Sequence, residues 1–216
     1  MQLIAIDFET KAIEPRPKYP PWPVGVAIGG GDQHPRYLHW GHHDSDPYDY
    51  KSAVATLEVI LENPDYEFVF HNAAFDCCII EEKLDLVVPW DRVHDTMLLA
   101  FLANPFGELS LKPLADSLLD QPSTEQDAVQ DWLIRHGIVR ANDKHWGAHI
   151  CDAPASIVGP YAIGDITRAL DLFKHFTEGG DNKFKERKEK RDTKRFHGTN
   201  TGIDPAVSAE ILKGFL

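Results

Sequence analysis

Two acidic side chains follow an apolar run near the start of the chain, in the segment IAIDFET at residues 4–10. The apolar residues predict a buried strand, and strand residues two positions apart point to the same face, so Asp7 and Glu9 lie side by side. Such carboxylates repel each other unless one is protonated or a cation lies between them, and their oxygens favour Mg²⁺ or Mn²⁺ over zinc. A solvated strand end would explain the same pair, so both interpretations stay open.

Two later segments carry further polar groups that such a site could use. In HNAAFD, residues 71–76, a predicted strand ends near Asn72 and passes into a helix that carries Asp76. Sites of α/β proteins usually lie at such strand ends, although the helix dipole alone also favours an acid in a first turn. In YAIGD, Tyr161 and Asp165 are four residues apart and share one face of a predicted helix. Taken singly, such a pair is common on helix surfaces.

The elements that must position these residues alternate between strand and helix, which indicates an α/β fold whose first three strands form an antiparallel meander. The predicted strands span 2–8, 24–30, 36–40 and 66–72, and the predicted helices span 53–63, 74–83, 94–105, 110–119, 123–137 and 160–176. Residues 139–154 are predicted as loop, and Pro160 is expected to open the last helix. Five prolines in EPRPKYPPWPV, residues 14–24, favour an extended loop at the rim of a site after Glu9.

The composition is that of one compact globular domain, with 216 residues of which 43% are hydrophobic and 26% charged. The longest apolar runs fall short of the roughly 20 residues of a membrane helix, and the first strand starts almost at Met1, so we expect neither membrane contact nor a secretory signal. Three cysteines, two of them adjacent, fit reduced thiols better than disulfides. We therefore expect a cytoplasmic protein.

The charge is unevenly distributed along the chain. The net charge is −12, but residues 183–195 alone carry +5. Such a run is typical of a solvated helix face or a flexible tail, and a phosphate-contacting arm is the alternative. We expect a catalytic domain over residues 1–178 and a polar, basic, partly mobile tail over residues 179–216.

The DxE strand, the NxxxFD junction and the YxxxD helix, in this order, resemble the three signature motifs of the DEDD superfamily of 3′-to-5′ exonucleases. The tyrosine is similar to that of the DEDDy branch, which includes the proofreading domain of family A DNA polymerases, RNase D and the Werner-type exonucleases. HDTMLLAFL at 94–102 and SLKPLADSLL at 110–119 resemble two helices of the proofreading domain of DNA polymerase I. The resemblance extends from residue 1 to about residue 176.

This resemblance implies a ribonuclease H-like fold, a mixed sheet of about five strands flanked by helices, and two divalent cations, Mg²⁺ or Mn²⁺, in the site. It implies that Asp7 bridges both metals, that Glu9 and Asp165 complete the site of the metal that binds the attacking water, and that Asp76 holds the other. Tyr161, with Glu9, would orient the water rather than abstract its proton, because the usual pKa of tyrosine is about 10. Thr10 and Asn72 match positions that touch the 3′-terminal nucleotide.

The expected function is a 3′-to-5′ exonuclease that hydrolyses single-stranded or frayed DNA 3′ ends to nucleoside 5′-monophosphates, in proofreading or repair. Residues 201–212 resemble the segment that leads into the palm of family A polymerases, so the chain is expected to act alone, as a truncated piece, or beside a separate polymerase subunit, as in phages. The nearest alternative is an RNase D-like exoribonuclease. A non-catalytic nucleic-acid-binding module is a further alternative, which the intact set of motif residues disfavours.

Overall fold

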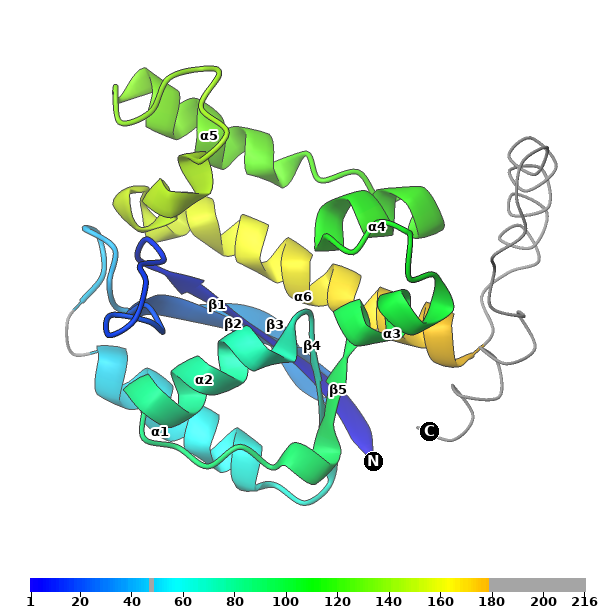
Figure 1. Ribbon diagram of the computed structural model, residues 1–216. Coiled ribbons are helices and arrows are strands. Elements are labelled where there is room, and N and C mark those ends of the chain that lie inside the picture. Colours follow the sequence, from blue (N-terminus) through cyan, green and yellow to red (C-terminus); the bar gives the residue numbers. More distant parts are fainter. Residues whose placement is uncertain (47–48, 179–216) are drawn as a thin grey trace, which may run out of the picture.

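The computed structural model describes residues 1–46 and 49–178, which form a mixed sheet with helices on both faces (Figure 1). The strands are β1 (Gln2–Thr10), β2 (Pro23–Gly30), β3 (Gln33–His39), β4 (Tyr66–Phe70) and β5 (Val93–Asp95). The helices are α1 (Asp49–Glu62), α2 (Ala73–Lys83), α3 (Thr96–Ala103), α4 (Leu111–Leu119), α5 (Glu125–Arg135) and α6 (Ala155–Thr177), with short 3₁₀ helices η1 (Trp90–Arg92) and η2 (Trp146–Asp152). The expected tail at 179–216, with its basic run at 183–195, lies outside the described residues.

The five strands follow the spatial order β3-β2-β1-β4-β5. β1 pairs antiparallel with β2 and parallel with β4, and β2 pairs antiparallel with β3, so the predicted meander and mixed sheet are confirmed. β1 is therefore the central strand, with its carboxyl end at the same edge of the sheet as the carboxyl end of β4. That edge is where an α/β fold gathers polar side chains from successive strands.

Alternation along β1 divides its side chains between two cores. Ile4, Ile6 and Phe8 pack in the cluster that α1 and α2 cover. Ala5 belongs to the cluster on the opposite face, which α6 covers. Because successive strand residues point to opposite faces, Asp7 shares the α6 side with Ala5.

The last helix begins five residues earlier than predicted, so the expectation that Pro160 opens it is wrong. Pro160 lies inside α6, after a start at Ala155 that follows Pro154 in an extended conformation. A proline inside a helix removes one backbone hydrogen bond. Burial of Val158 in a core cluster shared with α5 and η2, together with burial of Ala155, offsets that loss. Part of the loop predicted at 139–154 forms η2, whose Ile150 is buried in the same core cluster.

The helix predicted at 94–105 also begins with a different structure. Residues 93–95 form β5, a three-residue strand that pairs parallel with β4, and α3 starts only at Thr96. Three residues are too few for a periodic signal, and pairing with the edge of β4 determines their conformation. No helix in the described ranges is long and apolar enough to span a membrane.

Asp95, the last residue of β5, links the start of α3 to the start of α2. Its carboxylate caps α3 by accepting the backbone N–H groups of Met97 at 2.8 Å and Leu98 at 3.3 Å. It also accepts the N–H groups of Asn72 at 3.0 Å and Ala73 at 2.9 Å. One side chain thus fixes the first turns of two helices, and α2 is the helix that carries Asp76.

We predict that Asp95→Ala lowers the free energy of unfolding by roughly 2 to 4 kcal/mol, because it removes a helix cap and leaves further N–H groups without an acceptor. Urea denaturation followed by circular dichroism measures the loss. Asp91→Ala, at an exposed acid of η1, is the matched control and should change stability by less than about 0.5 kcal/mol. Equal effects of both substitutions would contradict the role assigned to Asp95.

Candidate active site

Three carboxylates from two elements meet on the α6 side of the sheet. One oxygen each of Asp7, Glu9 and Asp165 lies within 4.8 Å of the other two. β1 supplies the first two at its carboxyl end, and α6 supplies Asp165 because Ala162 and Ile166 anchor that helix on the sheet. Glu9 and Asp165 are buried, and Asp7 is half-buried. Three acids in such confinement need positive charge or protons beside them.

The fourth acid of the predicted set, Asp76, reaches β1 from the first turn of α2. Its carboxylate is buried and accepts the backbone N–H of Phe8 at 3.0 Å. Asp76 lies outside the three-acid group, yet after burial the charge of Asp7 contributes most to raising its pKa. Asp7 therefore has Asp165 of α6 as a close carboxylate neighbour, and its charge also acts on Asp76 of α2.

Burial raises the pKa of all four acids, and repulsion by neighbouring carboxylates raises the pKa of Asp7, Glu9 and Asp76 further. Burial, followed by the charge of Asp165, raises the pKa of Asp7 to about 8, while the ammonium of Lys112 acts in the opposite direction. Burial and the charges of Asp7 and Asp165 raise the pKa of Glu9 well above its usual range. Burial also raises the pKa of Asp165, against the attraction of Lys112. The cluster therefore retains protons near neutral pH, which a divalent cation would displace.

Tyr161 lies one turn before Asp165 on α6, at the side of the cluster. Burial, followed by the charge of Glu9, raises the pKa of its phenol well above 10. The hydroxyl thus stays protonated and is available to donate a hydrogen bond next to the carboxylates. The ring is held edge-on by Trp146, with ring centroids 6.3 Å apart.

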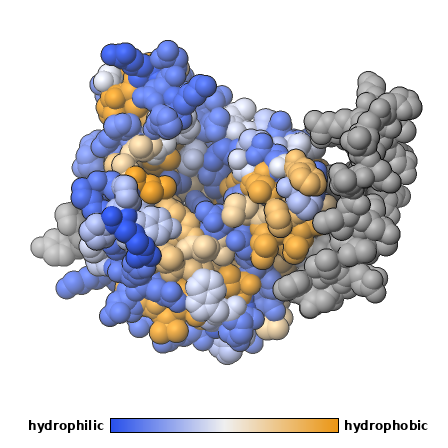
Figure 2. All heavy atoms as spheres, viewed as in Figure 1, coloured by the Kyte–Doolittle hydropathy of each residue, from blue (hydrophilic) through white to orange (hydrophobic). Residues whose placement is uncertain are grey.

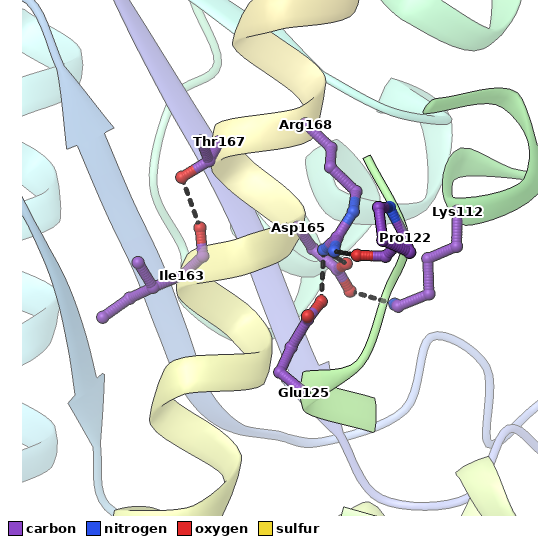
Figure 3. Close-up of polar contacts among 7 residues, drawn as sticks. All are labelled: Lys112, Pro122, Glu125, Ile163, Asp165, Thr167 and Arg168. Atoms are coloured by element: carbon purple, nitrogen blue, oxygen red, sulfur yellow. Dashed lines mark hydrogen bonds and ion pairs between the residues drawn. The ribbon is translucent and has the colours of Figure 1, made fainter. Parts of the chain in front are cut away.

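Two basic residues that the motif analysis did not single out contact the cluster (Figure 3). The Lys112 ammonium, on the first turn of α4, donates to Asp165 Oδ2 at 2.5 Å and lies 4.0 Å from the centroid of the Tyr161 ring. Arg168, one turn after Asp165 on α6, is buried and lies 3.5 Å from Asp165 Oδ1. Both oxygens of Asp165 therefore have a cationic neighbour.

Arg168 also fixes the start of α5 against α6. Its guanidinium donates to the carbonyl of Pro122 at 3.0 Å and forms an ion pair with Glu125, as Figure 3 shows. A Cβ atom at Gly164 would lie 2.8 Å from Arg168 Nη1 and 2.9 Å from Glu125 Oε1, so the absence of a side chain there makes room for the pair. The spacing of Asp165 and Arg168 by three residues was the available sequence signal, since such residues share a helix face.

Thr10 and Asn72 lie at the ends of two neighbouring parallel strands. Thr10 closes β1 at a register shift, and its hydroxyl donates to the carbonyl of Lys11 at 2.9 Å. Asn72 precedes α2 in the left-handed conformation, with φ of 68°, and its side chain makes no capping hydrogen bond to that helix. Both residues border the acidic cluster in sequence, Thr10 directly after Glu9 and Asn72 four positions before Asp76.

The donor chemistry fits hard divalent cations. All four acids offer only carboxylate oxygens, the ligands that Mg²⁺ and Mn²⁺ prefer, and three of them are already close enough to share an ion. Neighbouring groups orient two of these acids. Lys112 and Arg168 both contact Asp165, and the backbone N–H of Phe8 donates to Asp76. The arrangement can therefore bind metal and act on a phosphate ester.

Comparison with known proteins agrees with this geometry. The DNA polymerase of Escherichia phage T5 is 28% identical over 180 residues, which are 80% of this chain and 20% of that polymerase. The chain thus spans about a fifth of the length of this relative.

Solved structures share the fold. Trypanosoma brucei RNase D in complex with GMP is 16% identical, with a TM-score of 0.52 over 94% of this chain and 60% of that one. Brucella melitensis NrnC with bound Mg²⁺ is 17% identical, with a TM-score of 0.52 over 99% of this chain and 86% of that one. The predicted ribonuclease H-like fold is therefore confirmed. A family model described as 3′-5′ exonuclease matches residues 1–180, and the chain belongs to that family of nucleases.

Proposed function

We propose that the chain hydrolyses terminal phosphodiester bonds of DNA from the 3′ end, releases nucleoside 5′-monophosphates and depends on divalent metal. The observation that carries this proposal is the convergence of Asp7, Glu9 and Asp165 within 4.8 Å, with Tyr161 one helical turn away. Single-stranded or frayed ends are the preferred substrates in this proposal, since the net charge of −12 disfavours broad phosphate binding along a duplex. Proofreading or repair is the corresponding role.

Each of the four acids has a separate role in the proposed binding of two metal ions. Two divalent cations, Mg²⁺ or Mn²⁺, would stabilise the attacking and leaving oxygens of the displacement. Asp7 would contact both, because one of its oxygens lies within 4.8 Å of an oxygen of Asp165, and Asp76 accepts the backbone N–H of the next residue, Phe8. Glu9 and Asp165 would hold the cation beside the attacking water, and Asp76 the cation beside the leaving oxygen.

Tyr161 and Glu9 would orient the attacking water. The phenol is protonated at neutral pH and therefore donates a hydrogen bond rather than removing a proton. The ammonium of Lys112 lies over the Tyr161 ring, 4.0 Å from its centroid, and would help to hold the ring in place. Thr10 and Asn72, at the neighbouring strand ends, would contact the 3′-terminal nucleotide.

The match to a phage DNA polymerase favours DNA over RNA as the substrate. The alternative is an RNase D-like exoribonuclease, which the fold-level similarity to RNase D supports at only 16% identity. A role in replication would belong in the cytoplasm of a bacterium or a phage-infected bacterial cell.

A polymerase is the proposed partner, in the same chain or as a separate subunit. The relative from phage T5 is about five times as long as the part that matches. Apolar side chains gather over α3 in Figure 2, where Leu98 and Phe101 are 52% and 44% exposed and Phe106 follows at 90%. An exposed apolar patch of this kind is suited to contact another module.

We predict that Asp7→Asn lowers kcat/KM by at least about a thousandfold while it stabilises the metal-free protein. The loss follows because several kcal/mol of charge stabilisation depend on this ligand, at a factor of ten per 1.36 kcal/mol. The metal-free protein becomes more stable because the substitution removes one of the carboxylates that repel each other.

The stabilisation should grow with pH. Asp7 has a pKa of about 8 in the folded protein, above its unfolded value, so the wild type loses stability as pH rises toward 8 and the variant avoids that loss. Melting temperatures in EDTA between about pH 5 and pH 8 measure the difference. Glu58→Gln, at an exposed acid of α1, is the control, and a lower melting temperature of Asp7→Asn across this range would contradict the repulsion.

Tyr161→Phe should lower kcat by roughly tenfold to a hundredfold, because the variant keeps the ring but loses the donor that orients the water. The dissociation constant for Mn²⁺ should stay unchanged, since the phenol does not bind metal in this mechanism. Steady-state kinetics measures kcat, and isothermal titration calorimetry measures the dissociation constant for Mn²⁺. An unchanged kcat would exclude Tyr161 from orienting the water.

End-labelled oligonucleotides test the reaction and its substrate. We expect a 5′-labelled single-stranded DNA to shorten stepwise in Mg²⁺ and a matched RNA to react more slowly. A 3′-labelled DNA should release labelled mononucleotide in the first step. Faster cleavage of the RNA would favour the RNase D-like alternative, and internal cleavage products would contradict exonuclease activity.

A further inference from the structure

The proline-rich loop at residues 11–22, which follows Glu9 and Thr10 in the chain, carries an exposed tryptophan, a half-buried tyrosine and exposed basic side chains. It leaves β1 directly after Glu9 and Thr10 and returns to β2, and the N–H of Lys11 donates to the carbonyl of Trp22 at 3.0 Å to close its base. The loop carries three basic residues and one acid, in a chain whose net charge is −12. Figure 2 shows its hydrophilic side chains beside the paler, more apolar surface of α2.

The loop lies along α2, the helix that carries Asp76. Near the start of that helix, the ring of Tyr19 packs at 6.4 Å from the ring of Phe75, the residue before Asp76. Near its end, the ammonium of Lys83 lies 5.4 Å from the centroid of the Trp22 ring. At 1.5 Å of rise per residue, the backbone positions of Asp76 and Lys83 are about 10 Å apart along the helix.

Packing alone does not explain these aromatic residues. Trp22 is 56% exposed, and a large ring left in water contributes little to the stability of the fold. Arg16 lies 5.7 Å from the centroid of the Tyr19 ring and 3.5 Å from Glu82 Oε1, in an exposed ion pair that a phosphate can compete for. An exposed ring and a half-buried ring with cations beside them combine the two features that bind single-stranded nucleic acid: a stacking surface for bases and positive charge for phosphates.

We propose that Trp22, Lys83, Tyr19 and Arg16, here named the loop platform, bind the single strand upstream of the scissile bond. At the 3.4 Å spacing of stacked nucleotides, the 10 Å along α2 corresponds to about three nucleotides. A strand whose 3′ end lies at Asp76 can therefore place an upstream base on Trp22 and a phosphate at Lys83. This inference rests on the proposed function and adds to it a preference for strands longer than a dinucleotide.

The platform selects unpaired strands of any sequence. Stacking on an aromatic face needs a base that is free of its partner, and every base has such a face. A paired duplex offers the ring only its backbone and grooves. The platform therefore favours a single-stranded or frayed end over a blunt duplex.

The first test is binding without catalysis. In an Asp7→Asn background, we expect Trp22→Ala to raise the Kd for a labelled twelve-nucleotide single-stranded DNA about tenfold by fluorescence anisotropy, with rescue by Trp22→Phe. Lys83→Met should lower the slope of log Kd against the logarithm of the salt concentration by about one, because one phosphate contact is lost. The control is Trp90→Ala, which removes a tryptophan of similar exposure, 54%, from η1. A Kd within twofold of the parent for Trp22→Ala, or an equal change for Trp90→Ala, would overturn the platform.

The second test separates the platform from the catalytic site. With an active enzyme, Trp22→Ala should raise KM for the twelve-nucleotide strand about tenfold and leave hydrolysis of a dinucleotide unchanged, because a dinucleotide is too short to reach Trp22. An equal loss on both substrates would overturn the proposal. If the unaltered protein hydrolyses neither substrate, the proposed function fails, and the anisotropy measurement alone decides whether the platform binds DNA.

Discussion

Repulsion between buried carboxylates is the constraint on which the rest of the structure depends. Asp7 lies close to Glu9 and Asp165, and burial together with the charge of Asp165 raises its pKa to about 8. A fold selected for stability alone would avoid such a cluster, since each confined charge must be neutralised by a proton, a cation or a basic side chain. Binding of a divalent cation would therefore relieve this repulsion, as the proposed mechanism requires.

The surrounding structure keeps these acids close despite their repulsion. β1 is the central strand, so hydrogen bonds to a strand on each side hold its backbone in place. α6 is anchored to the sheet by a buried apolar face. Lys112 and Arg168 each contact one oxygen of Asp165, and Asp95 fixes the start of α2 behind Asp76. Supporting contacts of this kind orient metal ligands and are as necessary as the ligands themselves.

The sequence predicted which of these polar residues share a face better than it predicted the residues that contact them. The spacing of Asp7 and Glu9 predicted a shared strand face, and the spacing of Tyr161 and Asp165 predicted a shared helix face, because both rules act within one element. The meeting of β1 with α6 could be expected only from the family resemblance, since no local pattern encodes it. Lys112 was missed because its partner is 53 positions away in the chain. The three-residue β5 and the early start of α6 were missed because tertiary packing overrides local signals.

Calorimetric titration with Mn²⁺ near pH 7, in buffers of different ionisation enthalpy, tests the central claim most directly. We expect uptake of about two ions per chain together with release of protons, since the acids that hold metal are protonated before it binds. The absence of ion uptake, or uptake without proton release, would contradict a cluster held together by exchange of protons for metal.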